Sequence, residues 1–470
     1  MSASSVAQLD IRRLSALLCA GKLSPVELTQ ATLDRIERKN PELNAYLTVL
    51  ADAALEQARQ AEREIRAGQY RGPLHGVPVS VKDIFFTRGT RTTCGSKIYA
   101  DYVPDFDATT VERLRAAGAV LVGKTNLHEL AYGITNNNPH YGATRNPWDR
   151  ARIPGGSSGG SGVAVAASLC AASLGTDTGG SVRIPAAYCG TVGLKPTFGR
   201  VSRWGVLPLG WSLDHVGPLA RTVWDTAVVL RAIAGPDVRD DQCAVTRALD
   251  YLVDLDAGVR GMVVGVPEDF FFSGLDAQVE RAVRSAAAKL AELGARLEPV
   301  RLPFVQAATD LARLVLLAEA SAFHQRDLRA RRAEFGPDVR ALLEQGEFIL
   351  AADYVNAQRA RRKFMQQMAS VLRKVTVLIA PTAPITAPPI GATTVPVNGA
   401  AEDVRLASTR LVRALNFLGV PVLSLPCGFD EEGLPISLQI IGKPFDEATV
   451  LRVGAAYEAA CEWVHRRPPD

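Results

Sequence analysis

Two glycine–serine clusters flank a run of small residues between positions 155 and 181, which reads GGSSGGSGVAVAASLCAASLGTDTGGS. In the second cluster, glycines let the N–H groups of Gly179, Gly180 and Ser181 turn toward one point, because no β-carbons crowd it. Such converging donors form an oxyanion hole, and a serine hydroxyl at the same point would be a nucleophile. No histidine lies near either cluster. A lysine can act as the base instead, if burial lowers its pKa until it is neutral.

Other interpretations of these clusters fit the sequence less well. A flexible linker would not carry the apolar stretch between the clusters, which must be buried to be stable. A phosphate-binding loop would need a lysine after the glycines, and none follows. The stretch from Gly156 to Gly160 formally matches a G-x-S-x-G nucleophile elbow, with His215, His324 and His465 as possible bases. The elbow requires a buried strand directly before it, and NPWDRARIP is not typical of one.

The candidate base is Lys82, which ends the strand-like stretch of LHGVPVSVKDIFF. Apolar residues flank it on both sides, as burial of a neutral lysine would require. Taken alone, the segment also fits a solvent-facing lysine on an edge strand, with Pro78 favouring that position.

Three motifs together resemble the amidase signature family of serine hydrolases. They are HGVPVSVKD, GGSSGGSG and GTDTGGSVRIPAAYCGTVGLKPTFGRVS, in the family's order, and the likeness extends from about residue 65 to about residue 460. The resemblance implies a Ser-Ser-Lys triad in which Ser181 is the nucleophile, Ser157 the bridging serine and Lys82 the base. It also implies a cis peptide bond before Ser157.

The resemblance further assigns supporting roles around the triad. It implies that the oxyanion hole consists of the backbone donors of Thr178, Gly179, Gly180 and Ser181. Asp177 and Arg183 are expected to support this loop, and Ser158 and Ser161 to be hydrogen-bonding neighbours. No metal and no organic cofactor is implied.

The elements that must position these residues indicate an α/β protein. Short β-branched runs alternate with amphipathic helical patterns. With the resemblance, this predicts an α/β/α sandwich around a large mixed, mostly parallel sheet. We expect an N-terminal helical segment at 1–65 and one amidase signature domain at 66–465, with a mostly helical, cap-like insertion at about 268–374. We also expect a helix of small residues between the two clusters, holding both loops in register.

Composition restricts the functional classes further. The 470 residues carry a net charge of +4 without a dense basic block, so no nucleic-acid partner is expected. No apolar run is typical of a membrane span or signal peptide, and no membrane association is expected. The seven cysteines form no C-x-x-C pair, which is typical of reduced thiols in a cytoplasmic protein.

The sequence therefore predicts an amidohydrolase that cleaves the C–N bond of a small carboxamide through an acyl-enzyme, with a homodimer as a possible assembly. The stretch 129–148 should line the substrate pocket, with Ala131, Tyr132 and Gly133 nearest the chemistry. The alternative is the glutaminase subunit of a tRNA-dependent amidotransferase, which the C-terminal stretch resembles. In those subunits an aspartate stands seven residues before the asparagine of an N-L-A-G turn. Here the turn begins at Asn416 and the matching residue is Thr409, which favours the free-standing amidase. With a shifted alignment, Asp403 or Glu402 would be the alternative acid at this place.

Overall fold

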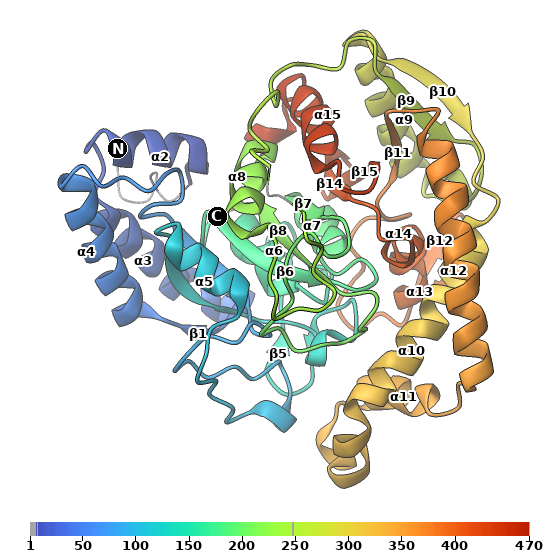
Figure 1. Ribbon diagram of the computed structural model, residues 1–470, viewed down its shortest axis with the longest axis horizontal. Helices are drawn as coiled ribbons and strands as arrows, with labels where there is room; N and C mark the ends of the chain where they lie inside the picture. The colour runs from blue at the N-terminus through green and yellow to red at the C-terminus, as the bar shows by residue number, and fades with distance from the viewer. Residues whose placement is uncertain (1–5, 7, 247–248, 470) are drawn as a thin grey trace.

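A computed structural model describes residues 6, 8–246 and 249–469 of the chain (Figure 1). Within this part of the chain, eleven strands form one sheet in the order β1-β3-β2-β6-β8-β7-β14-β15-β11-β9-β10. These strands are β1 (Tyr46–Val49), β2 (Pro78–Lys82), β3 (Val120–Thr125), β6 (Ala172–Asp177), β7 (Val192–Lys195), β8 (His215–Ala220), β9 (Val263–Pro267), β10 (Arg296–Val300), β11 (Val377–Pro381), β14 (Val422–Phe429) and β15 (Pro435–Ile441). Two small two-stranded sheets pair β4 (Asn137–Asn138) with β5 (Gly142–Ala143) and β12 (Thr394–Val397) with β13 (Ala400–Asp403).

The large sheet is mixed, as predicted, but it is not mostly parallel. Strand β2 pairs in parallel with β3 and β6, and β9 pairs in parallel with β10 and β11. Every neighbouring pair from β6 through β8, β7, β14 and β15 to β11 is antiparallel, as is the pair of β1 with β3. The sequence analysis did not identify β7 and β8, and these two strands account for much of the antiparallel centre.

Helices cover both faces of this sheet. Helices α3, α6 and α7 pack on one side, and α8, α9 and α15 pack on the other (Figure 1). The helices are α2 (Ile11–Cys19), α3 (Pro25–Leu43), α4 (Ala51–Arg66), α5 (Thr109–Ala116), α6 (Gly159–Ala166), α7 (Arg183–Cys189), α8 (Val223–Ile233), α9 (Ala277–Glu292), α10 (Val305–Ala330), α11 (Pro337–Gly346), α12 (Ala351–Leu372), α13 (Val404–Thr409), α14 (Arg413–Leu418) and α15 (Glu447–Ala459), with 3₁₀ turns η1 (Lys97–Tyr99), η2 (Glu129–Ala131), η3 (Phe270–Phe272), η4 (Arg332–Glu334) and η5 (Trp463–His465).

The N-terminal segment is not purely helical, contrary to the expectation for residues 1–65. Helix α3 begins as the sequence predicts, because Ser24 and Glu27 form a capping box and Pro25 occupies the first turn. After it, however, β1 joins the edge of the large sheet beside β3. The segment therefore contributes a strand to the central sheet.

The stretch expected as a helical insertion divides into two parts. Helix α9 and strand β10 belong to the α/β layers, since β10 pairs with β9 at the sheet edge. The long helices α10 and α12 with α11 form the helical part, and α10 and α12 both pack against α14 (Figure 1). The helical part therefore lies over the C-terminal segment that helps to build the site.

The small-residue helix between the two clusters is shorter than predicted. Helix α6 ends at Ala166, and the second half of the run forms the buried strand β6. The reason for small residues in α6 is close packing: a β-carbon on Gly160 would lie 2.4 Å from the Asn126 carbonyl oxygen and 2.5 Å from that of Ala45. The helix thus fits tightly against the chain that precedes it.

No helix in the described part of the chain is long and apolar enough to cross a membrane.

The packing of α6 predicts a difference between two glycine-to-alanine substitutions. Gly160→Ala should lower the free energy of unfolding by about 1–3 kcal/mol, because backbone oxygens cannot move away from the added methyl group. Gly162→Ala is the matched control. Its methyl group meets the Pro185 side chain at 3.1 Å and the Cys189 sulfur and the Pro185 carbonyl oxygen at 3.2 Å, so each of these contacts is longer than those at Gly160. Denaturant unfolding measures both, and equal stability of the two variants would contradict the packing argument.

Candidate active site

The nucleophile candidate Ser181 lies in the loop between β6 and α7. Strand β6 ends at Asp177, and the loop continues through Thr178, Gly179 and Gly180 to Ser181, which is 6% exposed. Gly180 has φ of 120°, and a β-carbon there would lie 2.4 Å from a Val412 methyl group. Glycine is therefore required at this position by both backbone conformation and space.

Lys82 is fully buried at the end of β2, and its ammonium group reaches the first glycine–serine cluster. Its Nζ donates hydrogen bonds to the Ser157 hydroxyl at 2.8 Å and to the Thr176 hydroxyl at 2.7 Å. Strands β2 and β6 are parallel neighbours, so Lys82 and Thr176 emerge at the same edge of the sheet. The two sequence-predicted residues Lys82 and Ser157 are thus in direct contact.

The environment of Lys82 favours its neutral form. Burial lowers the pKa of Lys82 to about 7, against the smaller opposing effects of the Asp214 and Asp177 carboxylates and Cys94. An ordinary exposed lysine would be almost wholly protonated at neutral pH. A substantial fraction of Lys82 is therefore able to accept a proton at neutral pH.

Ser157 lies just before α6, and the bond between Gly156 and Ser157 is cis, as expected. The following serines connect α6 to β6. The Ser158 hydroxyl donates to the Thr176 carbonyl oxygen at 3.2 Å, and the Ser161 hydroxyl donates to that of Leu174 at 3.2 Å. Ser158 and Ser161 are therefore hydrogen-bonding neighbours that align the two cluster loops.

The donors predicted for the oxyanion hole are not equally available. The Gly180 N–H donates to the Asp177 carboxylate at 2.8 Å, so it is already engaged. The Thr178 side chain donates to Asp214 at 2.5 Å, which fixes the start of the loop. The Ser181 hydroxyl has no hydrogen-bond partner among the described residues. This leaves the N–H groups of Thr178, Gly179 and Ser181 as the candidate donors to a substrate oxygen.

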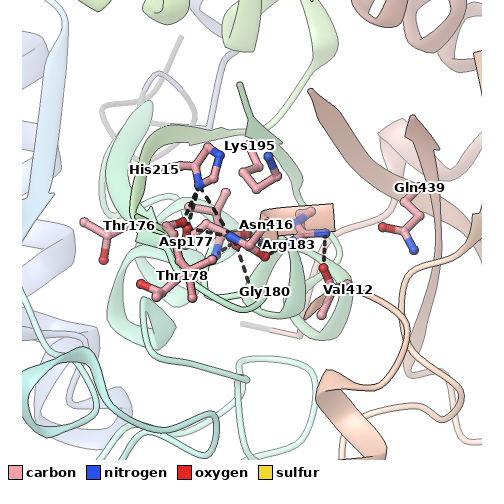
Figure 2. A network of polar contacts seen from close by, with 12 residues as sticks. Thr176, Asp177, Thr178, Gly180, Arg183, Lys195, His215, Val412, Asn416 and Gln439 are labelled. Carbon is pink, nitrogen blue, oxygen red and sulfur yellow. Dashed lines mark hydrogen bonds and ion pairs between the residues drawn. The ribbon is translucent and has the colours of Figure 1, made fainter. Parts of the chain in front are cut away.

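A buried ion pair supports the nucleophile loop, with both side chains fully buried (Figure 2). Asp177 accepts from Nε of Arg183 at 3.0 Å and from a terminal nitrogen of Arg183 at 2.9 Å. Burial alone would raise the pKa of Asp177, but the Arg183 guanidinium holds it well below its usual range. Arg183 also donates to the Val412 carbonyl and to Asn416, whose amide donates to Asp177 at 2.8 Å. The predicted supporting pair therefore connects the loop to the segment that begins α14.

A cavity of about 570 Å³ adjoins the site and reaches it at Thr176 and Thr178. Its walls are largely apolar, and Asp214 and His215 are among the polar residues that line it. The aromatic and aliphatic lining includes Phe86, Phe106, Trp204, Leu207, Leu209, Trp211 and Phe323. Such a cavity provides room for a substrate larger than a simple acetamide.

The residues predicted for the pocket wall have different surroundings. Ala131 lines the cavity. Tyr132 is 2% exposed, and the Arg405 guanidinium carbon lies 5.5 Å from the centre of its ring. Gly133 is packed against His128, since a β-carbon there would lie 2.1 Å from Nε2 of that histidine. Their role in substrate binding remains a prediction.

The comparisons with known proteins agree with this geometry. The sequence profile of the family described as Amidase matches residues 27–451. The chain belongs to the amidase family. Solved members share its fold: a structure described as "Crystal structure of amidase" is 37% identical with a TM-score of 0.88, and the alignment covers 97% of this chain and 100% of that one.

Two further relatives are described with different functions. The glutamyl-tRNA(Gln) amidotransferase A subunit of Chloroflexus aurantiacus is 45% identical, with 98% of each chain covered. A structure described as "An unexpected vestigial protein complex reveals the evolutionary origins of an s-triazine catabolic enzyme" is 37% identical with a TM-score of 0.93, covering 96% of this chain and 98% of that one. The predicted family and α/β fold are confirmed.

The sequence analysis did not identify several residues that contact the candidate triad or its supports. Thr176 bonds to Lys82, Asp214 bonds to Thr178, and Asn416 bonds to Asp177. Thr176 directly precedes Asp177 in β6, so it could have been predicted as a site residue from its neighbour in the sequence. Asp214 and Asn416 lie far from the motifs in sequence, and only the fold brings them close. No group of three or more His, Cys, Asp or Glu side chains is placed to hold a metal within the described ranges.

The first prediction of the site concerns the protonation of Lys82. Because only neutral Lys82 can accept a proton, kcat/KM for an amide substrate should increase about tenfold per pH unit below pH 7 and level off above it. Lys82→Ala should lower kcat/KM by about 10²–10⁴-fold. Lys97→Ala, at an exposed lysine, is the control and should keep the wild-type rate and profile. A wild-type rate that is constant from pH 5 to pH 9 would rule out this role.

The second prediction concerns the identity of the nucleophile. An organophosphorus probe should modify Ser181, because that hydroxyl is free of other hydrogen bonds and lies beside the candidate oxyanion donors. Peptide mapping by mass spectrometry locates the adduct. Ser158 and Ser161 are internal controls, since both are fully buried and hydrogen-bonded to β6. An adduct on Ser158 would instead support the nucleophile-elbow interpretation.

Proposed function

We propose that this chain is an amidohydrolase that cleaves a small carboxamide through an acyl-enzyme on Ser181. The observation that carries the proposal is the contact between buried Lys82 and Ser157 at 2.8 Å, beside the loop that carries Ser181. The lowered pKa of Lys82 and the glycine-rich loop beside it support the roles of base, bridging hydroxyl and backbone oxyanion donors that we propose. Membership of the amidase family supports hydrolysis of a C–N amide bond.

The reaction begins with a proton relay. Neutral Lys82 accepts the proton of Ser157, and Ser157 accepts the proton of Ser181 as the Ser181 oxygen attacks the amide carbonyl carbon. The resulting oxyanion is stabilised by the backbone N–H groups of Thr178, Gly179 and Ser181. Ser181 forms no hydrogen bond to Ser157 before substrate binds, so its hydroxyl must rotate toward Ser157 during binding.

The second half of the reaction returns the relay to its starting state. The proton passes back through Ser157 to the amide nitrogen, the C–N bond breaks, and ammonia or an amine leaves. Water then loses a proton to the same relay and attacks the acyl-enzyme. The C–O bond to Ser181 breaks, Ser181 recovers its proton, and the carboxylic acid is released.

A second candidate function is that of the glutamine-hydrolysing component of a tRNA-dependent amidotransferase. Amidotransferase A subunits from several bacteria are 41–45% identical over 98% of this chain. By sequence identity, the comparisons favour this second function over the free-standing amidase that the sequence analysis preferred. In this role the chain would act with partner subunits and a tRNA-dependent substrate, contrary to the expectation of no nucleic-acid partner.

One geometric observation supports the free-standing amidase instead. Glutamine carries an α-ammonium group, which needs a buried acid as its partner. Position 409, where the amidotransferase pattern has an aspartate, holds a threonine whose hydroxyl accepts a hydrogen bond from Arg413 at 2.5 Å. A cationic residue therefore lies beside the position at which glutamine would need an anion, and we retain the free-standing amidase as the principal proposal.

The third prediction separates the two functions. The chain purified alone should release ammonia from simple carboxamides faster than from glutamine, because the site offers the α-ammonium no acid at Thr409. Ammonia release is measured directly, with Ser181→Ala as the inactive control. Thr409→Asp should improve glutamine hydrolysis relative to the wild type, since it restores a carboxylate there. Efficient glutamine hydrolysis by the wild type, or stable copurification with partner subunits, would establish the second function.

A further inference from the structure

Arg413 lies directly against the nucleophile loop. It begins α14 and is 6% exposed, and a β-carbon on Gly179 would lie 3.9 Å from both its Cγ and its Nε. One terminal nitrogen donates to the Thr409 hydroxyl at 2.5 Å. Its Nε is buried and has no hydrogen-bond partner in the described chain. A buried charged donor without an acceptor is costly, which points to a ligand that supplies the acceptor.

A second buried donor without an acceptor faces the same cluster. The Tyr132 hydroxyl donates to no acceptor among the described residues, although the side chain is 2% exposed. Burial raises the pKa of Tyr132 to about 12, while the positive charges of Arg405, Arg413 and Arg313 act in the opposite direction. The hydroxyl therefore stays protonated at neutral pH and is available as a donor.

Two more cations surround these donors. The Arg405 side chain from α13 lies over the Tyr132 ring, and Arg313 extends from α10, which packs against α14 (Figure 1). Burial lowers the pKa of Arg413 to about 10, and Arg405 and Arg313 add to this effect by repulsion. Arg413 is therefore still charged at neutral pH.

The acids that face this cluster are exposed and form their hydrogen bonds elsewhere. Asp338 bonds to His128 at 2.9 Å, Asp403 accepts from the Leu406 N–H at 2.9 Å, and Asp310 accepts from Gln306. Within the described ranges, no carboxylate forms an ion pair with any of the three arginines. The cluster thus has an excess of positive charge and two buried donors without acceptors, of which Arg413 lies against the nucleophile loop.

We infer that Arg413 and Tyr132 bind a carboxylate on the acyl part of the substrate. The substrate class is then the monoamides of small dicarboxylic acids that lack an ammonium group beside the carboxylate. Carboxylate oxygens can accept from Arg413 Nε and from the Tyr132 hydroxyl together, and such charge-assisted hydrogen bonds are strong. The inference rests on the proposed amide hydrolysis and specifies its substrate.

The experiment compares amides that differ in one group only. Malonamate, succinamate and glutaramate are paired with propanamide, butanamide and pentanamide, in which a methyl group replaces the carboxylate. We expect at least one acid to have a kcat/KM about tenfold to a hundredfold above that of its neutral partner. Asparagine and glutamine add only the α-ammonium to succinamate and glutaramate, and should be poorer substrates than those acids. Neutral amides that react as fast as the acids, or glutamine that reacts faster than glutaramate, would overturn the inference.

Substitution of Arg413 tests the residue itself. Arg413→Gln should reduce kcat/KM for the preferred acid by about tenfold to a hundredfold and leave its neutral partner within a few-fold of the wild type. Arg410→Gln is the matched control, because Arg410 lies in the same segment and also has a buried Nε without a partner, but its terminal nitrogen donates to the Gly274 carbonyl. Tyr132→Phe removes one donor with little change in packing, and it tests the same preference if Arg413→Gln does not fold. Equal losses on both substrates would indicate a purely structural role and overturn the inference.

Ligand binding separates this inference from the proposed function. If the wild type hydrolyses no amide, the proposed hydrolysis fails, and calorimetry with Ser181→Ala still tests the subsite. The dicarboxylates malonate, succinate and glutarate are compared with pentanoate in that variant and in Ser181→Ala/Arg413→Gln. Tighter binding of a dicarboxylate that requires Arg413 would support the anion subsite, and binding that does not require Arg413 would overturn it.

Discussion

The architecture of the site depends on the buried ion pair between Asp177 and Arg183. Both side chains are fully buried, and Asp177 also accepts from the backbone N–H groups of Gly180 and Val182. Removing two charged side chains from water costs roughly several kcal/mol for each of them, and only complete hydrogen bonding offsets this cost. The pair meets that condition, because Arg183 also donates to Val412 and Asn416. The same interactions fix the curvature of the nucleophile loop and attach it to α14.

This attachment brings together candidate catalytic and recognition groups from distant parts of the sequence. Ser181 is carried by the loop after β6, whereas Arg413 is carried by the first turn of α14. The ion-pair network holds the two segments together, so the distance between the candidate carboxylate subsite and the nucleophile is fixed. The candidate base and the candidate carboxylate-binding residue also differ in protonation. Burial lowers the pKa of Lys82 to about 7, so that part of it is neutral at neutral pH, while Arg413, with a pKa of about 10, keeps its charge.

The residues of the candidate triad could be predicted from the sequence more readily than the residues that surround them. The glycine-rich loop made Ser181 a candidate nucleophile and the apolar strand made Lys82 a candidate base, but the triad of Lys82, Ser157 and Ser181 was implied by the resemblance to the amidase signature family. The contact of Lys82 with Ser157 agrees with that proposal. Asp214, Asn416 and Arg413 could not be proposed in the same way, since their proximity depends on strands and helices far apart in the chain. Strands β7 and β8 were missed because they are short and rich in glycine or proline, which hides the alternation typical of strands.

The position of β1 has a consequence for how the chain can be divided. Strand β1 pairs with β3 along the edge of the large sheet. A fragment that began near residue 66 would leave the backbone N–H and C=O groups of β3 unpaired and open to solvent. Open sheet edges template pairing with other chains, and β3 consists of fully buried residues. Strand β1 is itself the outer strand of the sheet, but it is only four residues long, and short edge strands offer little backbone for such pairing. Residues 46–49 are therefore part of the central sheet, and the segment that contains them cannot be removed without exposing β3.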